Sequence, residues 1–200
     1  ASSPSSAWRL QEFDDSSWLK GLAPFGYGEG VFGTELNDMQ GQYSSIFLRK
    51  PFYIESLENV DSLTFESSYA GGFILWINGS EVTRINVPGK SNDLLSFDSL
   101  ATAPSITPQT NRLERQIEQL NSLHPGFNQI AVQLLNHSLD SPSLTFALAL
   151  QTQGSIDLDL DALPDRWEVD VINADPEDGL NSIIELLPDE DSDGDRFSNR

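Results

Sequence analysis

Strict alternation of side chains along the stretch SLTFALALQT (143–152) limits the fold of this chain more than any other feature of its sequence. Leu144, Phe146, Leu148 and Leu150 alternate there with Thr145, Ala147, Ala149 and Gln151. Successive side chains of a β-strand point to opposite faces, so this spacing places the four large apolar side chains on one face. We therefore predict a strand with one face in a hydrophobic core.

Other short apolar runs, separated by turn residues, have the same character. They cover residues 44–54, 61–70, 71–79, 80–87 and 127–138. The dipeptide Asn78-Gly79 separates two of these runs and suits a type I′ hairpin turn. The segment 111–123 is ambiguous, because Leu113, Ile117 and Leu120 fit a helical stripe but could also belong to an irregular strand.

The order of these runs indicates the class of fold. No long helix alternates with the expected strands, which disfavours a parallel α/β sheet. Many short strands divided by Gly, Pro, Ser and Asn are typical of an antiparallel β-sandwich. We therefore predict an all-β fold made of two antiparallel sheets.

Charge divides the chain and excludes several classes of partner. The formal net charge is −20, from 11 basic and 31 acidic residues, which makes nucleic acid or an anionic membrane surface a poor partner. Residues 157–200 alone hold 15 acidic and 3 basic residues. We expect a sandwich domain over 1–155 and a separate acidic segment over 156–200.

The chain has no cysteine and no apolar run of about 20 residues, so we expect neither disulfides nor membrane insertion.

The acidic segment opens with DLDLDALPDRWE (157–168), whose spacing matches a calcium-binding loop of the EF-hand type. Such a loop supplies oxygen ligands from positions 1, 3, 5, 7, 9 and 12, the seventh through its backbone carbonyl. In this sequence those positions are Asp157, Asp159, Asp161, Leu163, Asp165 and Glu168. Ala162 stands at position 6, where glycine normally makes the turn, so the turn would be strained or differ in geometry.

A second copy of the spacing begins near the end of the sequence. Its expected ligands are Asp191, Asp193, Asp195, Phe197 through its carbonyl, and Asn199, with Asp189 as a further candidate. Position 12 would be residue 202, so either ligands are shared between loops or the sequence is a piece of a longer polypeptide. A solvated acidic linker is the competing interpretation, but a linker has no reason to repeat this spacing. Magnesium suits such a site less well than calcium, because it retains more water.

The segments DLDLDALPDRWE and DEDSDGDRFSN also resemble thrombospondin type 3-like calcium-binding repeats of bacterial surface and secreted proteins. The resemblance covers about 44 residues. It implies Ca²⁺ as the bound ion and a location outside the cell, either secreted or on the cell surface.

The first 155 residues resemble the galactose-binding-like jelly-roll domain of multidomain bacterial secreted proteins. The segments that carry the resemblance are 12–30, 46–54, 71–88, 127–138 and 144–151, and the long connection 88–126 departs from the family pattern. The resemblance implies a two-sheet antiparallel jelly-roll sandwich. It also implies that the domain binds carbohydrate or acts as a spacer.

A sugar site would need an aromatic ring as a stacking platform with polar groups nearby. The candidates for a ligand platform are Trp76, Tyr69 and His137, with Tyr27, Tyr43 and Trp18 as weaker alternatives. Core packing is the competing interpretation for each aromatic residue. His137, together with Asn136, follows an apolar strand and is expected to cap it through hydrogen bonds.

Catalysis is not indicated. The two histidines, His124 and His137, belong to no recognisable constellation, and no nucleophile elbow, zinc-protease motif or P-loop is present. We therefore expect a noncatalytic extracellular module, a structural or adhesive sandwich with a calcium-stiffened acidic linker, within a larger protein. The alternative is a carbohydrate-binding module that targets a neighbouring enzyme to polysaccharide.

Overall fold

The structure is a computed structural model, and it describes residues 3–57, 60–105 and 107–154. Its elements are η1 (Ser6–Arg9), β1 (Phe25–Tyr27), β2 (Thr34–Glu35), β3 (Ser45–Ile54), β4 (Ser62–Ala70), β5 (Gly72–Ile77), β6 (Ser80–Ile85), β7 (Gln109–Gln116), η2 (Ile117–Gln119), β8 (Gly126–Leu135) and β9 (Leu144–Gln153). The only helical elements among the described residues are the two short 3-10 turns.

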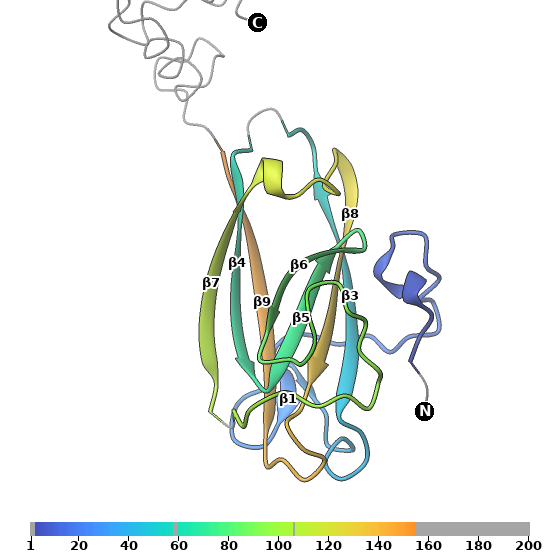
Figure 1. The fold of residues 1–200 in the computed structure, drawn as a ribbon, viewed down its shortest axis with the longest axis vertical. Helices are drawn as coiled ribbons and strands as arrows, with labels where there is room; N and C mark the ends of the chain where they lie inside the picture. The colour runs from blue at the N-terminus through green and yellow to red at the C-terminus, as the bar shows by residue number, and fades with distance from the viewer. Residues whose placement is uncertain (1–2, 58–59, 106, 155–200) are drawn as a thin grey trace, which may run out of the picture. The chain divides into compact units, whose positions relative to one another are not determined.

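The strands form two sheets that pack as a sandwich (Figure 1). One sheet has five strands in the order β2-β1-β9-β4-β7, and the other has four in the order β3-β8-β5-β6. The pairs β1–β9, β3–β8, β4–β7, β5–β6 and β5–β8 are antiparallel, whereas β1 and β2 are parallel. The prediction of an all-β sandwich is confirmed.

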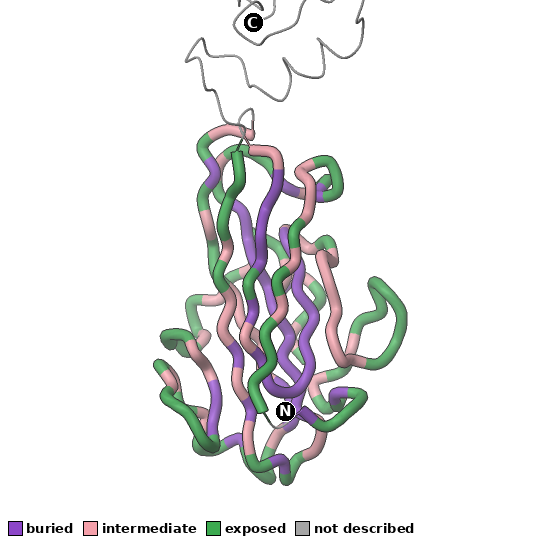
Figure 2. Tube along the Cα trace, turned by 90° about the vertical axis from the view of Figure 1, so that its left-hand side faces the viewer, coloured by how far each residue is buried: buried purple, intermediate pink, exposed green. Residues whose placement is uncertain are grey.

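The inner core lies between the two sheets. Phe73 of β5 meets both Tyr69 of β4 and Phe146 of β9 edge-on, with ring centroids 5.2 Å apart in each pair. Leu144 and Phe146 are buried in β9, whereas Leu148 and Leu150 are half-buried, so the predicted face is confirmed and is deepest at the start of the strand. Buried residues follow the central strands, and exposed residues gather on the turns (Figure 2).

A second core covers the outer face of the four-stranded sheet. Trp8, Ile74, Trp76 and Ala131 form its buried centre, and Phe13, Trp18, Phe47, Val87 and Leu95 pack around it. The rings of Trp8 and Trp76 meet edge-on at 5.6 Å. Trp8 belongs to residues 6–18, here called the N-terminal segment, which therefore supplies a third layer over this sheet.

Arg49 of β3 fastens the N-terminal segment to the sheet. Its side chain is only 3% exposed and forms an ion pair with Asp15. Its guanidinium also donates hydrogen bonds to the carbonyl oxygens of Phe13, at 3.2 Å, and Leu10, at 2.6 Å. Hydrogen bonds from a charged donor are stronger than neutral ones. This one side chain therefore binds the N-terminal segment firmly at three residues, Leu10, Phe13 and Asp15.

Turn chemistry explains the β5–β6 hairpin. Asn78 and Gly79 have φ angles of 47° and 86°, the left-handed values that a type I′ turn requires at both central positions. The predicted hairpin is confirmed.

The ambiguous segment 111–123 is a strand to Gln116, then a single 3-10 turn, and then a loop, so its helical interpretation is wrong.

Among the described residues, no helix has the length and apolar character needed to cross a membrane.

Candidate functional site: a polar cleft beside the β5–β6 hairpin

The predicted calcium ligands, Asp157 to Asn199, lie outside the described residues. Within residues 3–57, 60–105 and 107–154, no three His, Asp or Glu side chains are grouped so that they could hold a metal ion.

Trp76 and Tyr69 lie in the two cores, so neither can act as an open stacking platform. Trp76 is 1% exposed, beneath Trp8 and the guanidinium of Arg9, which lies 5.3 Å from its ring centroid. Tyr69 is 6% exposed, and its hydroxyl lies 3.2 Å from the Gln109 side-chain oxygen. The burial of both rings therefore gives no support to the prediction of a ligand platform at these two residues.

His137 has the structural role that its position after a strand indicates. Its backbone N–H donates to Asn136 Oδ1 at 3.0 Å, and its ring Nδ1 lies 3.2 Å from Ser141 Oγ. Asn136 in turn donates to the Tyr27 hydroxyl at 2.6 Å. The expected hydrogen-bonded cap at the end of β8 is confirmed, and it uses polar groups of His137 that a ligand would need.

The weaker aromatic candidates are also part of the framework. Trp18 stacks on Trp8 at 6.3 Å within the outer core. The Tyr43 hydroxyl donates to Asp38 at 2.7 Å. Burial, together with the hydrogen bond and charge of Asp38, raises the pKa of Tyr43 to about 12, so its phenol stays neutral at physiological pH.

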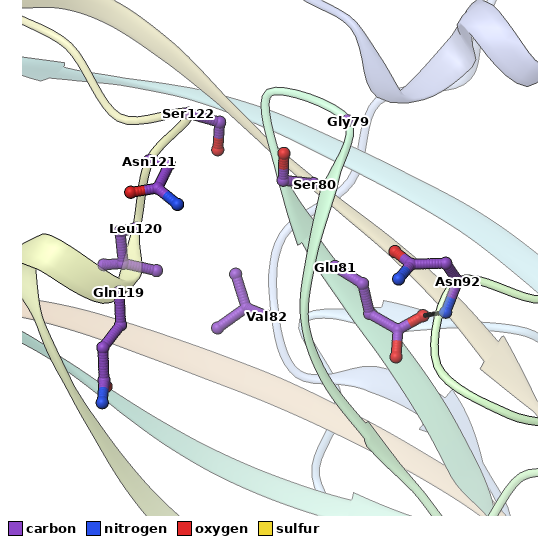
Figure 3. Close-up of a pocket in the computed structure, with 9 residues that line it drawn as sticks. All are labelled: Gly79, Ser80, Glu81, Val82, Asn92, Gln119, Leu120, Asn121 and Ser122. Carbon is purple, nitrogen blue, oxygen red and sulfur yellow. Dashed lines mark hydrogen bonds between the residues drawn. The ribbon is translucent and has the colours of Figure 1, made fainter.

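A polar cleft of about 330 Å³ lies beside the β5–β6 hairpin (Figure 3). One wall comes from the hairpin and the other from η2 and the loop after it. The lining residues are Gly79, Ser80, Glu81, Val82, Asn92, Gln119, Leu120, Asn121 and Ser122.

Side-chain amides set the distance between the two walls. Asn78 Nδ2 donates to the Ser122 carbonyl and to Asn128 Oδ1, both at 2.7 Å. Ser122 Oγ donates to the Ile77 carbonyl at 2.9 Å, and Asn128, fully buried, donates to the His124 carbonyl at 2.7 Å. This network ties the loop after η2 to the hairpin, so the cleft is a fixed feature of the fold.

Glu81 carries the charge on the hairpin wall, and that charge is already paired. Its side chain is 4% exposed and accepts hydrogen bonds from Arg84 at 2.8 and 2.9 Å and from the Asn92 backbone N–H at 2.8 Å. Burial alone would raise the pKa of Glu81, but these hydrogen bonds and the Arg84 charge together lower it below its ordinary value of 4.5. A carboxylate held ionised in this way is unsuited to proton transfer near neutral pH.

Three other polar side chains of the cleft are uncommitted. Ser80, Gln119 and Asn121 form no side-chain hydrogen bond with the described part of the chain, and all three are exposed. Leu120 is buried and Val82 half-buried between them, which gives the cleft an apolar base. An apolar base with amide and hydroxyl groups at its rim suits a neutral, hydroxyl-bearing ligand.

A second hollow, of about 500 Å³, is more apolar. Trp18, Phe25, Phe47 and Leu48 are among the side chains that line it. Of its polar groups, the Thr34 hydroxyl is used by the Leu22 backbone and the Tyr43 hydroxyl by Asp38. This hollow therefore offers less hydrogen bonding to a ligand than the polar cleft does.

The lowered pKa of Glu81 predicts a pH-dependent contribution to stability. A carboxylate whose pKa is lower in the folded state stabilises that state above pH 4.5, and the contribution is lost as the pH falls through the folded pKa. We expect Glu81→Gln to be less stable than the wild type at neutral pH, with the gap closing below pH 4.5. Urea unfolding from pH 3 to 7 measures this, with exposed Glu118→Gln as the control. A gap that does not change with pH would contradict it.

The cleft could not be predicted from the sequence. The Asn78-Gly79 dipeptide predicts the hairpin that forms one wall, but the other wall belongs to segment 111–123, for which the sequence is compatible with either a helix or a strand. The one available signal was the amide-rich stretch EQLNS (118–122) directly before a predicted strand.

Comparison of the chain with protein-family models gave no match, and comparison with curated proteins gave none either.

Proposed function

We propose that this chain is a noncatalytic module of a larger extracellular protein. In this proposal, a jelly-roll sandwich of the galactose-binding-like type has a structural or adhesive role. The acidic segment that follows it binds calcium and stiffens the connection to the next part of the polypeptide.

The observation that carries the proposal is where the last strand ends. β9 continues as a sheet strand to Gln153, and the first expected calcium ligand, Asp157, follows only four residues later in the sequence. A connection this short allows only limited movement between the strand and the first loop. An ion that orders the acidic segment would therefore restrict the direction in which the chain continues from the sandwich.

The chemistry of the donor set supports calcium in particular. Every expected ligand is a carboxylate, an amide oxygen or a backbone carbonyl, and Ca²⁺ takes six to eight such oxygens. Residues 157–200 have a net charge of −12 from 15 acidic and 3 basic residues, so without cations their carboxylates repel one another. Asp157, Asp159, Asp161, Asp165 and Glu168 would hold the first ion, with the Leu163 carbonyl.

Calcium is expected to stabilise the acidic segment. At a free calcium concentration 100-fold above the dissociation constant, binding adds about 2.7 kcal/mol to the stability of whatever unit the ion orders. Thermal melts and limited proteolysis in millimolar calcium and in EDTA measure this. We expect calcium to raise the melting temperature of that unit and to slow cleavage within 155–200.

Asp159→Ala removes one expected ligand of the first loop and should clearly reduce both calcium effects, because the ion held by Asp157–Glu168 is lost. Asp175→Ala is the matched control, because it removes the same charge from the same segment outside the expected ligand positions. Melts and cleavage rates that coincide in calcium and EDTA would leave the segment as an acidic linker.

A second candidate function, carbohydrate binding, is favoured by the polar cleft. Its uncommitted Ser80, Gln119 and Asn121 side chains and its apolar base match what a sugar offers, which is hydroxyl groups around an apolar C–H surface. The pairing of Glu81 with Arg84 keeps the wall free of unpaired charge, which suits a neutral sugar.

The double variant Gln119→Ala/Asn121→Ala tests this candidate on a glycan array. Each hydrogen bond contributes about 0.5–1.5 kcal/mol, so losing two should weaken binding roughly tenfold or more. Exposed Gln40→Ala serves as the control. Binding of equal strength in the double variant and the wild type would exclude the cleft as the sugar site.

A further inference from the structure

Two aromatic side chains stand exposed side by side on the four-stranded sheet. The strands β3 and β8 lie side by side (Figure 1), and Tyr53 near the end of β3 is the direct partner of Phe127 near the start of β8 in their antiparallel register. They are 61% and 57% exposed. Their rings meet edge-on with centroids 5.1 Å apart and planes at 71°. Both rings are carried by paired strands, so the sheet sets the spacing of the two residues before any ligand arrives.

The pair lies on the sheet face that the N-terminal segment covers elsewhere. Side chains on one face of a strand recur every second residue, so Phe47, Arg49, Pro51 and Tyr53 share a face of β3. Phe47 packs in the outer core, and Arg49 binds the carbonyls of Leu10 and Phe13. Tyr53 is four residues beyond the point where Arg49 fastens the segment, and its exposure shows that the cover does not extend to it.

The exposed area is too small for a protein partner. A fully buried aromatic side chain covers about 150–250 Å², so the exposed fractions of these two rings give roughly 250 Å² together. A stable protein–protein interface needs about 800 Å² from each partner. An area of a few hundred Å² matches one or two sugar rings instead.

Charge also limits the occupant. The chain carries a net charge of −20, which opposes the approach of a second copy and of any polyanion. A neutral sugar incurs no such repulsion. The C–H hydrogens on one face of a pyranose ring are slightly positive, and they pack favourably on the negative face of an aromatic ring.

We propose that Tyr53 and Phe127 form an aromatic platform for a neutral polysaccharide, in which a pyranose ring stacks on the face of one ring while the other, at 71° to it, packs against the side of the sugar. The Tyr53 hydroxyl, which makes no hydrogen bond with the described residues, is free to bond a sugar hydroxyl. The platform is independent of calcium, and it does not require the polar cleft to bind sugar.

Affinity electrophoresis of the whole chain tests the proposal. Native gels that contain hydroxyethylcellulose, xylan or galactomannan are compared with a gel that contains no polysaccharide. We expect at least one polysaccharide to retard the wild type, equally in calcium and in EDTA. Phe127→Leu keeps an apolar side chain but removes the aromatic face, and it should weaken the affinity at least tenfold. Tyr53→Phe, which keeps the ring, should lose much less than Tyr53→Leu.

Controls separate this platform from the other proposals. Val31→Ala, at an apolar side chain that is 92% exposed elsewhere, should leave retardation unchanged. If the gel retards Phe127→Leu as strongly as the wild type but no longer retards Gln119→Ala/Asn121→Ala, sugar binding belongs to the cleft and the platform is overturned. The proposal is also overturned if no polysaccharide retards the wild type. A concentration-dependent dimer in sedimentation, abolished by Phe127→Leu, would overturn it too, because the occupant would then be a second copy.

Discussion

Trp76→Ala is expected to lower the free energy of unfolding by about 3–5 kcal/mol, the usual cost of removing a large aromatic side chain from a core. Trp76 is 1% exposed and lies where the sheet, Trp8 and Arg9 meet. Its removal leaves a cavity that Ile74 and Ala131 are too short to fill. Denaturant unfolding followed by far-UV circular dichroism measures the loss.

Two variants control for this prediction. Trp76→Phe keeps an aromatic ring in the outer core and should cost clearly less than Trp76→Ala. Leu94→Ala, at a side chain that is 58% exposed, should change stability by no more than about 0.5 kcal/mol. A loss below about 1 kcal/mol for Trp76→Ala would mean that the outer core contributes little to the fold.

Arg49→Ala is expected to cost about 2–4 kcal/mol and to release the N-terminal segment. The substitution leaves the carbonyl oxygens of Leu10 and Phe13 without their donor and removes the ion pair with Asp15. Leaving buried acceptors unpaired costs about 1–3 kcal/mol each, although partial exposure of these groups to water reduces the sum. Denaturant unfolding measures the loss of stability.

Arg49→Lys is the matched variant for the release of the segment. Lysine keeps the positive charge but lacks the planar fork that reaches several acceptors at once. We expect protease cleavage within residues 6–18 to be fastest in Arg49→Ala, intermediate in Arg49→Lys and slowest in the wild type. Equal cleavage in all three would contradict the role assigned to Arg49.

The longer strands could be predicted from the sequence because their signals are local. Alternation within 143–152 and the Asn78-Gly79 turn depend on nearest neighbours alone. β1 and β2 have no such signal, since they are three and two residues long. β1 depends on a distant pairing of Phe25 with Phe146, and Gly26 can approach the Leu144 carbonyl closely because it has no Cβ.

The aromatic residues show why the candidate site could not be predicted equally well. Alternation indicates that a residue lies on one face of a strand, but not whether another segment covers that face. The sequence offers Trp76 as a candidate platform, but Trp8 of the N-terminal segment packs against it and it is buried. Tyr53 and Phe127 fall within predicted strands and are exposed, because no described segment reaches them. The segment 6–18 carried no strand or helix signal that would have indicated its position on the sheet.

Equilibrium dialysis against ⁴⁵Ca²⁺ tests directly whether the acidic segment binds calcium. We expect at least one ion bound per chain at millimolar calcium, and loss of the ion held by Asp157–Glu168 in Asp159→Ala but not in Asp175→Ala. No bound calcium in the wild type at millimolar concentration, or equal binding by all three proteins, would contradict it.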